Sequence, residues 1–206
     1  MISQTAINIV NMEVQSKYHV SNERMAEEQA IIDLAKKDPA KFESLYERYH
    51  EQIFRYAYQR IDDKDLCHDV TQQVFLKALT SLHKYEFRGV PFSSWLYRIA
   101  QSEVYQALRD KQAERCVSLN ENMTAEMMDE VEDNKMGKEI QYERVAKAVA
   151  QLEEEDLQLV EMRFMEKRPF KEVAEILGIT ENNAKVKLYR ALEKLKKILI
   201  KKQTFW

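Results

Sequence analysis

The chain has 206 residues, of which 45% are hydrophobic and 33% are charged, and its formal net charge is −3. This length suits two small domains or one larger domain. Only three glycines and three prolines occur, which argues against an all-β fold, whose many turns would need both. The composition predicts an all-α fold made of long helices with few breaks.

The sequence contains no sign of a metal site, a cofactor or a membrane anchor. Its two cysteines, Cys67 and Cys116, form no C-x-x-C pair, so reduced thiols are expected. The N-terminus lacks the basic and apolar regions of a signal peptide, and no apolar run approaches the ~20 residues of a membrane span. We therefore expect a cytoplasmic protein without a membrane span, a metal or a cofactor.

The first two helices are predicted from a cap and a proline. Residues 1–21 show no clear periodicity and are expected to form a flexible arm. A helix then begins near Ser21, whose hydroxyl can cap it. Pro39 ends this helix and can open the next one, where its missing N–H is not needed. The second helix carries an apolar stripe from Phe42 to Phe54, at steps of three and four.

Two further helices complete the first predicted domain, residues 22–115. The pair Asp62-Asp63 is a favourable acidic start for a helix over about 64–82. The segment Gly89-Val90-Pro91 breaks the chain again, and a helix follows from residue 92 to about 113. The side chains expected to be buried on this fourth helix are Phe92, Trp95, Leu96, Ile99 and Ala100.

The middle of the chain is strongly acidic. Residues 120–134 contain six carboxylates and no lysine or arginine. We predict an acidic flexible linker over 116–139 and a second domain over 140–206. Within the second domain, helices are expected over 154–165, 169–177 and 180–202.

The strongest local motif is a predicted helix-turn-helix over residues 169–191. Gly178 can adopt the positive φ that ends the first helix and lets the chain turn, and Thr180 can cap the second helix. Such a unit places its second helix in the major groove of DNA, with the N-terminal residues at the base edges.

The second helix of this motif is basic. Residues 185–202 contain eight cationic side chains and one glutamate. The cations at steps of three and four share one face, which favours binding to the phosphate backbone. They are Lys187, Arg190, Lys194, Lys197 and Lys201. Leu188, Ala191, Leu195 and Leu199 lie on another face and are expected to be buried. The alternative is a solvated basic helix end.

Residues 172–191 resemble the fourth conserved region of bacterial sigma factors of the extracytoplasmic-function (ECF) group. The family pattern is roughly E-I-A-x-x-L-G-I-S-x-G-T-V-K-S-R-L-x-R-A, and this chain reads E-V-A-E-I-L-G-I-T-E-N-N-A-K-V-K-L-Y-R-A. Val186 stands where serine is common, and Asn182-Asn183 replace Gly-Thr. The resemblance implies contacts with the −35 promoter element, with Arg190 the best candidate for guanine. The candidate −35 residues are Thr180, Asn183, Lys185, Lys187, Arg190 and Lys194.

A second resemblance lies in the first domain. Residues 69–76, D-V-T-Q-Q-V-F-L, resemble the family's D-x-x-Q-E-V-F-L helix. The resemblance implies that this helix binds the clamp coiled coil of the largest polymerase subunit. The residues assigned to this contact are Asp69, Gln72, Gln73 and Leu76. An amphipathic helix with an ordinary polar outer face is the alternative.

Residues 92–102 resemble the segment that reads and melts the −10 element. They read F-S-S-W-L-Y-R-I-A-Q-S against a family pattern of F-x-x-W-L-Y-x-I-A-x-N. The candidate −10 residues are Arg98, Gln101, Ser102, Arg109 and Lys111. We expect Trp95 in the core, and Tyr97 and Tyr105 exposed.

The two resemblances together predict an ECF-type sigma factor that binds core RNA polymerase, directs it to −35 and −10 elements and helps to melt DNA. The expected partners are core polymerase and promoter DNA, and an anti-sigma factor is a further candidate. The acidic linker either threads toward the polymerase channel, as the resemblance implies, or serves as a solvated tether.

Two other classes of protein are compatible with a helix-turn-helix. One is a dimeric transcription regulator that acts without polymerase, and the other is an all-helical adaptor that binds only protein. An enzyme is not expected, because the sequence has no glycine-rich phosphate loop, metal-ligand cluster or nucleophile elbow.

Overall fold

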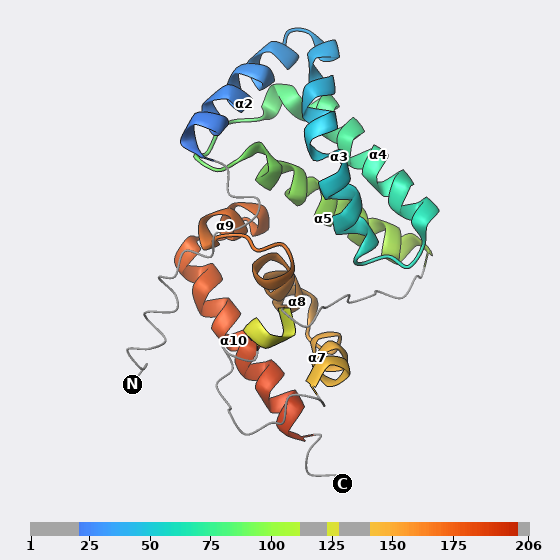
Figure 1. Cartoon of the computed structure of the whole chain (residues 1–206), viewed down its shortest axis with the longest axis vertical. Helices are drawn as coiled ribbons and strands as arrows, with labels where there is room; N and C mark the ends of the chain where they lie inside the picture. The colour runs from blue at the N-terminus through green and yellow to red at the C-terminus, as the bar shows by residue number, and fades with distance from the viewer. Residues whose placement is uncertain (1–20, 112–122, 128–140, 202–206) are drawn as a thin grey trace. The chain divides into compact units, whose positions relative to one another are not determined.

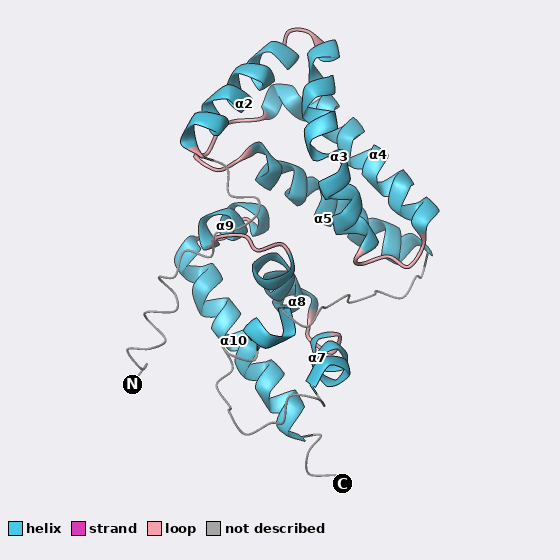
Figure 2. Cartoon of the chain, viewed as in Figure 1, coloured by secondary structure: helices cyan, strands magenta, loops and turns pink. Residues whose placement is uncertain are grey.

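The structure, a computed structural model, describes residues 21–111, 123–127 and 141–201. These residues form helices and the loops between them, without a strand in the described ranges (Figure 1, Figure 2). The all-α prediction is therefore confirmed. The arm expected over 1–21 lies outside the described residues except for its last residue, and the acidic linker lies outside them except for 123–127.

The described helices divide into two compact units. The first unit is built from α2 to α5, in which α4 packs against both α3 and α5. Its elements are α2 (Asn22–Ala35), the 3₁₀ turn η1 (Pro39–Phe42), α3 (Glu43–Tyr58), α4 (Lys64–Ser81), the 3₁₀ turn η2 (Leu82–Lys84) and α5 (Phe92–Lys111).

Side-chain caps fix where the helices of the first unit begin. The hydroxyl of Ser21 accepts a hydrogen bond from the backbone N–H of Arg24 at 3.3 Å, at the start of α2. The carboxylate of Asp63 accepts one from the N–H of Leu66 at 3.0 Å, at the start of α4. Each cap satisfies a donor that the first turn of a helix leaves unpaired. Both helix starts agree with the sequence prediction.

A buried carboxylate ties three helices of the first unit together. Glu28 of α2 is only 2% exposed. It accepts hydrogen bonds from the hydroxyl of Tyr49 in α3 and from the N–H of Phe92, the first residue of α5, the latter at 2.9 Å. Arg48 lies 3.5 Å away and adds an opposite charge. A carboxylate in this position accepts a hydrogen bond from an N–H that the first turn of α5 leaves unpaired. Its negative charge also interacts favourably with the positive end of the α5 helix dipole.

The aromatic side chains of α5 differ in part from the prediction. Tyr97 is fully buried, not exposed, and its ring meets that of Tyr56 edge-on at 5.0 Å. Trp95, expected in the core, is only partly buried, at 5.2 Å from the ring of Tyr85 and 5.4 Å from that of Phe92. The buried face of α5, which packs against α3 and α4, therefore differs from the predicted face by a rotation of about one residue, toward Tyr97.

The second unit contains most of the helix-turn-helix. Its helix α10 packs against α7 and α8. The short helix 123–127 belongs to the same unit, with Met127 fully buried. The longer elements are α7 (Gln141–Val149), α8 (Glu154–Val160), the π turn η4 (Glu161–Met165), α9 (Phe170–Leu177) and α10 (Glu181–Lys201).

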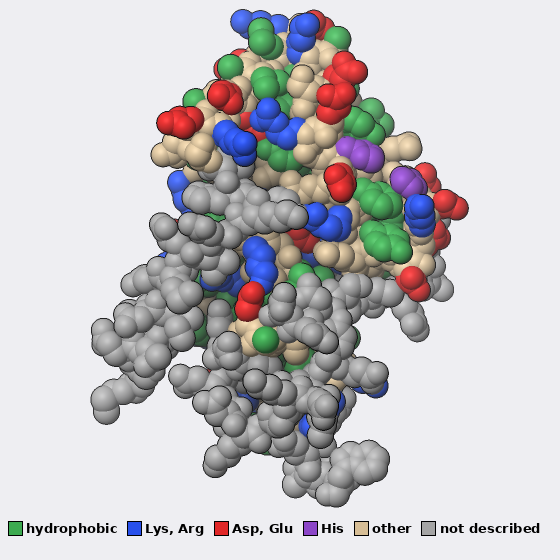
Figure 3. All heavy atoms as spheres, in the orientation of Figure 1, with side chains coloured by type: hydrophobic (Ala, Val, Ile, Leu, Met, Phe, Trp, Pro, Cys, Tyr) green, Lys and Arg blue, Asp and Glu red, His purple; other side chains and the backbone are tan. Residues whose placement is uncertain are grey.

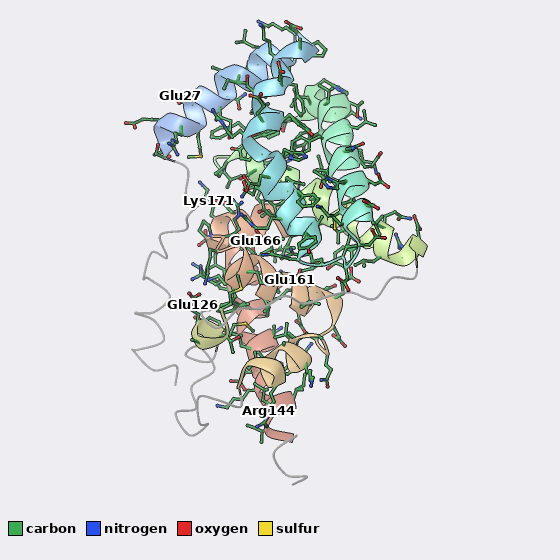
Figure 4. All side chains as sticks on the ribbon, turned by 45° about the vertical axis from the view of Figure 1, so that its right-hand side comes forward. Glu27, Glu126, Arg144, Glu161, Glu166 and Lys171 are labelled. Atoms are coloured by element: carbon green, nitrogen blue, oxygen red, sulfur yellow. The ribbon has the colours of Figure 1, made fainter. Side chains whose placement is uncertain are left out.

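Buried charged side chains surround the connection from α8 to α9. Arg168 is fully buried and pairs with Glu172 at 2.8 Å. Glu161 and Glu166, from η4 and the residue after it, are also buried (Figure 4). Because an unpaired charge in a protein interior costs several kcal/mol, such groups persist only with partners. This connection is therefore held by polar contacts as well as by apolar packing.

The turn of the helix-turn-helix matches the sequence prediction. Gly178 has φ +67°, and the N–H of Ile179 donates to the carbonyl oxygen of Ala174 at 3.0 Å. This is the Schellman ending of a helix. The hydroxyl of Thr180 then accepts from the N–H of Asn183 at 3.2 Å and caps α10. A Cβ at position 178 would meet nothing within 4 Å, so the backbone angle alone requires glycine.

We predict that Gly178→Ala lowers the free energy of unfolding of the second unit by about 1–2 kcal/mol, because alanine pays a steric cost in the left-handed region. Gly178→Asn should cost less, since asparagine tolerates this conformation. Urea unfolding followed by circular dichroism measures both. Equal costs for the two variants would contradict this explanation.

We also predict that Glu28→Ala destabilises the first unit by about 1–3 kcal/mol, because it removes a buried carboxylate that accepts hydrogen bonds from the Tyr49 hydroxyl and the Phe92 N–H. The matched control is Glu27→Ala, a neighbouring exposed carboxylate (Figure 4), which should change the stability by less than about 0.5 kcal/mol. Thermal and urea unfolding of both variants measure the difference. A loss of the same size in the control would argue against the role of Glu28.

Candidate nucleic-acid interface

The apolar stripe of α10 determines which face of this helix is exposed. The side chains on the stripe are each 3% exposed or less, which confirms the expected buried face. They are Ala184, Leu188, Ala191, Leu192, Leu195 and Leu199. Because this stripe packs against α7 and α8, the opposite side of α10 faces away from these two helices.

The centre of the exposed side combines one arginine with apolar side chains. Arg190 is exposed and has no hydrogen-bond or ion-pair partner within the described ranges. Val186 and Tyr189 lie nearby on the helix and are each 40% exposed. A guanidinium group with open donors can form a bidentate contact with guanine, and an apolar side chain can contact a thymine methyl group. This surface has the chemistry of a base-reading helix.

Two of the predicted DNA-contacting lysines are already in ion pairs. Lys187 Nζ lies 2.9 Å from Glu155 Oε2. Lys194 Nζ lies 2.5 Å from Asp156 Oδ2 and 3.3 Å from Glu153 Oε2. The hydrogen bond from Lys187 is the main reason that the pKa of the Glu155 carboxyl lies below its usual range, and the positive charge of Lys187 is the second reason. The hydrogen bonds to Asp156 and then to Glu153 raise the pKa of Lys194.

The remaining members of the predicted −35 set lie in the first turns of α10. Lys185 pairs with Glu181 at 2.8 Å, and its ammonium lies 5.6 Å from the centre of the Phe170 ring. Thr180 serves as the cap, and Asn183 supplies the capped N–H while its side chain is exposed. The structure therefore brings the whole set onto one helix, but it leaves only one of the four cations without an ion pair in the part described.

The predicted polymerase contact forms one exposed side of α4. Asp69, Gln72, Gln73 and Leu76 are all exposed, and Leu76 retains 54% of its surface. The residues between them that face inward are Val70, Thr71, Val74 and Phe75. A single exposed leucine is common on protein surfaces, so Leu76 indicates a binding surface only together with apolar neighbours.

Aromatic side chains of α3 extend this surface, and the sequence interpretation missed them. The ring of Tyr46, which is 37% exposed, lies 4.8 Å from that of Phe75 in α4 and 4.9 Å from that of His50. The rings of Phe54 and His68 lie 4.5 Å apart. Figure 3 shows histidine and hydrophobic side chains together over α3 and α4. Only the packing of the two helices brings these rings beside the predicted contact.

The predicted −10 residues divide into exposed and buried side chains. Arg98 is 37% exposed, and Ser102 and Arg109 are exposed. Gln101 is only 9% exposed, so its side chain is part of the packed face of α5 and does not offer the contact that was expected. The side chain of Lys111 lies outside the described residues. The steps of four and seven residues between the exposed members place them on one side of α5.

The carboxylates that bind the lysines of α10 were not anticipated as part of the interface. They come from the acidic run 153–156 at the start of α8, which is visible in the sequence. Their partners, however, are 32 to 41 residues away along the chain. No local spacing rule connects residues so far apart, so only the packing of α8 against α10 reveals the pairs.

No helix in the described ranges has both the length and the apolar character that crossing a membrane requires. A search of the same residues for groups of three or more potential metal-binding side chains likewise finds none.

Comparison with known proteins identifies both units. Residues 45–114 match the family Sigma-70 region 2, and residues 142–195 match the family Sigma-70, region 4. Together the two matches cover more than half of the chain.

Curated relatives agree with these matches. The chain is 26% identical over 158 residues to the ECF RNA polymerase sigma factor BldN of Streptomyces coelicolor, covering 77% of this chain and 60% of that protein. It is 28% identical over 162 residues to the RNA polymerase sigma factor YlaC of Bacillus subtilis, covering 77% of this chain and 92% of the relative.

Solved structures share the fold. The structure of CnrH in complex with the cytosolic domain of CnrY has a TM-score of 0.56 at 19% identity, covering 82% of this chain and 95% of that one. The sigma factor RpoE, solved with the anti-sigma factor NepR from Bartonella quintana, has a TM-score of 0.51 at 17% identity, covering 77% and 96%. On the matches to both sigma-70 regions and to curated ECF proteins, the chain belongs to the sigma-70 family, as an ECF-type sigma factor.

Proposed function

We propose that this sigma factor binds core RNA polymerase, directs it to promoters with −35 and −10 elements, and helps to melt the DNA. The observation that carries the proposal is the presence of both conserved regions in one chain, in the order region 2 then region 4. We take residues 22–115 as the domain that binds polymerase and the −10 element, and residues 140–206 as the domain that binds the −35 element.

Core polymerase is the proposed partner of α4. Leu76 supplies an exposed apolar centre, while Asp69, Gln72 and Gln73 supply polar groups around it. Burial of such an apolar centre, with polar groups paired at its rim, is how specific protein interfaces gain affinity. The exposed ring of Tyr46 extends the apolar part of the surface.

Promoter DNA is the proposed partner of α10 and α5. In the −35 element, Arg190 would contact base edges from α10, and neighbouring lysines would contact phosphates. In the −10 element, Arg98 and Arg109 would hold the displaced strand while a flipped base is accommodated near Ser102. Gln101 is not included among these contacts, because it is buried.

The connection between the domains would join two weak DNA contacts into one strong contact. When one site is bound, the linker keeps the other at a high effective concentration, provided that its length suits the distance between the sites. The acidic character of residues 120–134 would keep this segment away from DNA, whether it serves as a tether or enters the polymerase channel.

An anti-sigma factor is a further proposed partner, by analogy with the sigma factor RpoE, which was solved in complex with one. The alternative of a dimeric regulator that acts without polymerase is not favoured, because it would leave the match to region 2 without a role.

We predict that Arg190→Glu reduces run-off transcription from promoters that depend on a −35 element by at least about 10-fold, because loss of one bidentate base contact alone costs ~1–3 kcal/mol. Binding to core polymerase should remain unchanged. The control is Lys147→Glu, which makes the same charge change at an exposed position of α7 and should retain transcription. Full activity of Arg190→Glu on such promoters would count against α10 as the reading helix.

We further predict that Leu76→Asp weakens association with core polymerase by about 10-fold or more, because truncating a central contact of an interface costs ~2 kcal/mol or more. Leu34→Asp is a matched control, since Leu34 is 56% exposed and lies on α2 of the same unit, outside the proposed surface. Native gel shift or surface plasmon resonance with purified core enzyme measures both. Equal affinities of the two variants would exclude Leu76 from the contact.

A further inference from the structure

The lysines on one edge of α10 face carboxylates at the start of α8. Glu155 lies 2.9 Å from Lys187, and Glu153 lies 3.3 Å from Lys194. We propose that Glu153 and Glu155 act as internal counter-charges, which occupy these two lysines and lower the affinity of α10 for the phosphates of DNA. The proposal rests on the proposed function in one respect, namely that α10 is the helix that contacts DNA.

The two glutamates are not needed for packing. The side chain of Glu155 is 79% exposed and that of Glu153 is 84% exposed. Exposed ion pairs contribute little to the stability of a fold. Asp156 differs, because its side chain is only 12% exposed and its pair with Lys194 belongs to the contact between α8 and α10. Substitution of the exposed pair therefore changes the charges that α10 presents and leaves the packing intact.

Carboxylate oxygens and phosphate oxygens compete for the same ammonium donors. A lysine held by a glutamate must exchange that partner before it binds a phosphate, so part of the energy of the new contact is lost. Phosphate contacts supply most of the affinity in sequence-independent binding to DNA. The two glutamates thus reduce binding that is independent of sequence.

The same arrangement increases the relative weight of base recognition. Arg190, at the centre of the exposed side, has no ion pair in the described part of the chain and needs no such exchange. When phosphate contacts are weakened and the base-reading arginine is unpaired, stable binding to DNA depends more on the additional contact with polymerase. The glutamates of α8 are therefore determinants of selectivity in the proposed DNA contact.

The test is a fluorescence anisotropy titration of the full chain with a random-sequence DNA duplex, repeated over a range of salt concentrations. For Glu155→Gln we expect a rise in affinity of about two- to five-fold. Combining it with Glu153→Gln should add a smaller rise, because Lys194 keeps its ion pair with Asp156 at 2.5 Å. The slope of log affinity against log salt should also become steeper, by up to about 0.9 for Lys187 once it is released to a phosphate.

Glu154→Gln is the matched control. It removes the same charge from the same turn, but the Glu154 carboxylate accepts a hydrogen bond from Gln158 at 3.3 Å and forms no ion pair with a lysine among the residues that the structure describes. Its effect on affinity should stay under about two-fold, with an unchanged salt slope. Thermal unfolding checks that all variants keep the stability of the original chain.

Equal gains for Glu154→Gln and Glu155→Gln would overturn the proposal, because net charge alone would then explain the effect. Unchanged or weaker binding of the double variant would overturn it as well. Run-off transcription decides the proposed function separately. If the protein supports transcription but the glutamate substitutions do not change duplex binding, only this inference is wrong. If the substitutions change duplex binding but the protein supports no transcription, only the proposed role as a polymerase subunit is wrong.

Discussion

The second unit depends on the packing of α10 against α7 and α8. Leu188, Ala191 and Leu195, buried by this contact, fix the rotation of the helix about its own axis. That rotation sets Arg190 at the centre of the exposed side and turns Lys187 and Lys194 toward the acidic start of α8. A rotation by one residue, about 100°, would exchange the buried and exposed faces in part and would present a different set of cations.

Buried charges give each unit a specific arrangement in addition to apolar packing. Glu28 joins α2, α3 and the start of α5, and Arg168 with Glu172 joins the α8–α9 connection to α9. Apolar side chains pack in many neighbouring arrangements at similar energy, whereas a buried carboxylate or guanidinium group accepts only those that supply its partners. Helix α5 begins at the Glu28 carboxylate, and α9 begins beside the Arg168–Glu172 pair.

The proposed contacts with polymerase and DNA use the same structural device. On α4 and on α10, a buried stripe faces the unit while the opposite side carries an exposed apolar or aromatic side chain among polar and charged ones. The surface of α10 is not strongly charged by itself, since its lysines are largely paired in the described part of the chain. Modest surfaces of this kind suit a protein that binds stably only when both of its partners are present together.

The sequence by itself determined the helical fold, the starts of several helices and the identity of the two conserved regions. These are local properties, since Ser21, Asp63 and Thr180 cap helices within three residues of themselves, and Gly178 ends α9 through its own backbone angle. Helical periodicity likewise identified the buried stripe of α10, whereas the exposed side of α4 came from the resemblance to the family.

Only the tertiary structure decided which of the candidate side chains are available. Gln101 and Tyr97 are buried because the neighbouring helices set the rotation of α5, which periodicity leaves uncertain by about one residue. Lys187 and Lys194 are bound by Glu155, Glu153 and Asp156, whose distance along the chain hides the pairing. The physical reason is the same in each case, because burial and ion pairing depend on what packs against a helix, and that is decided by contacts between distant segments.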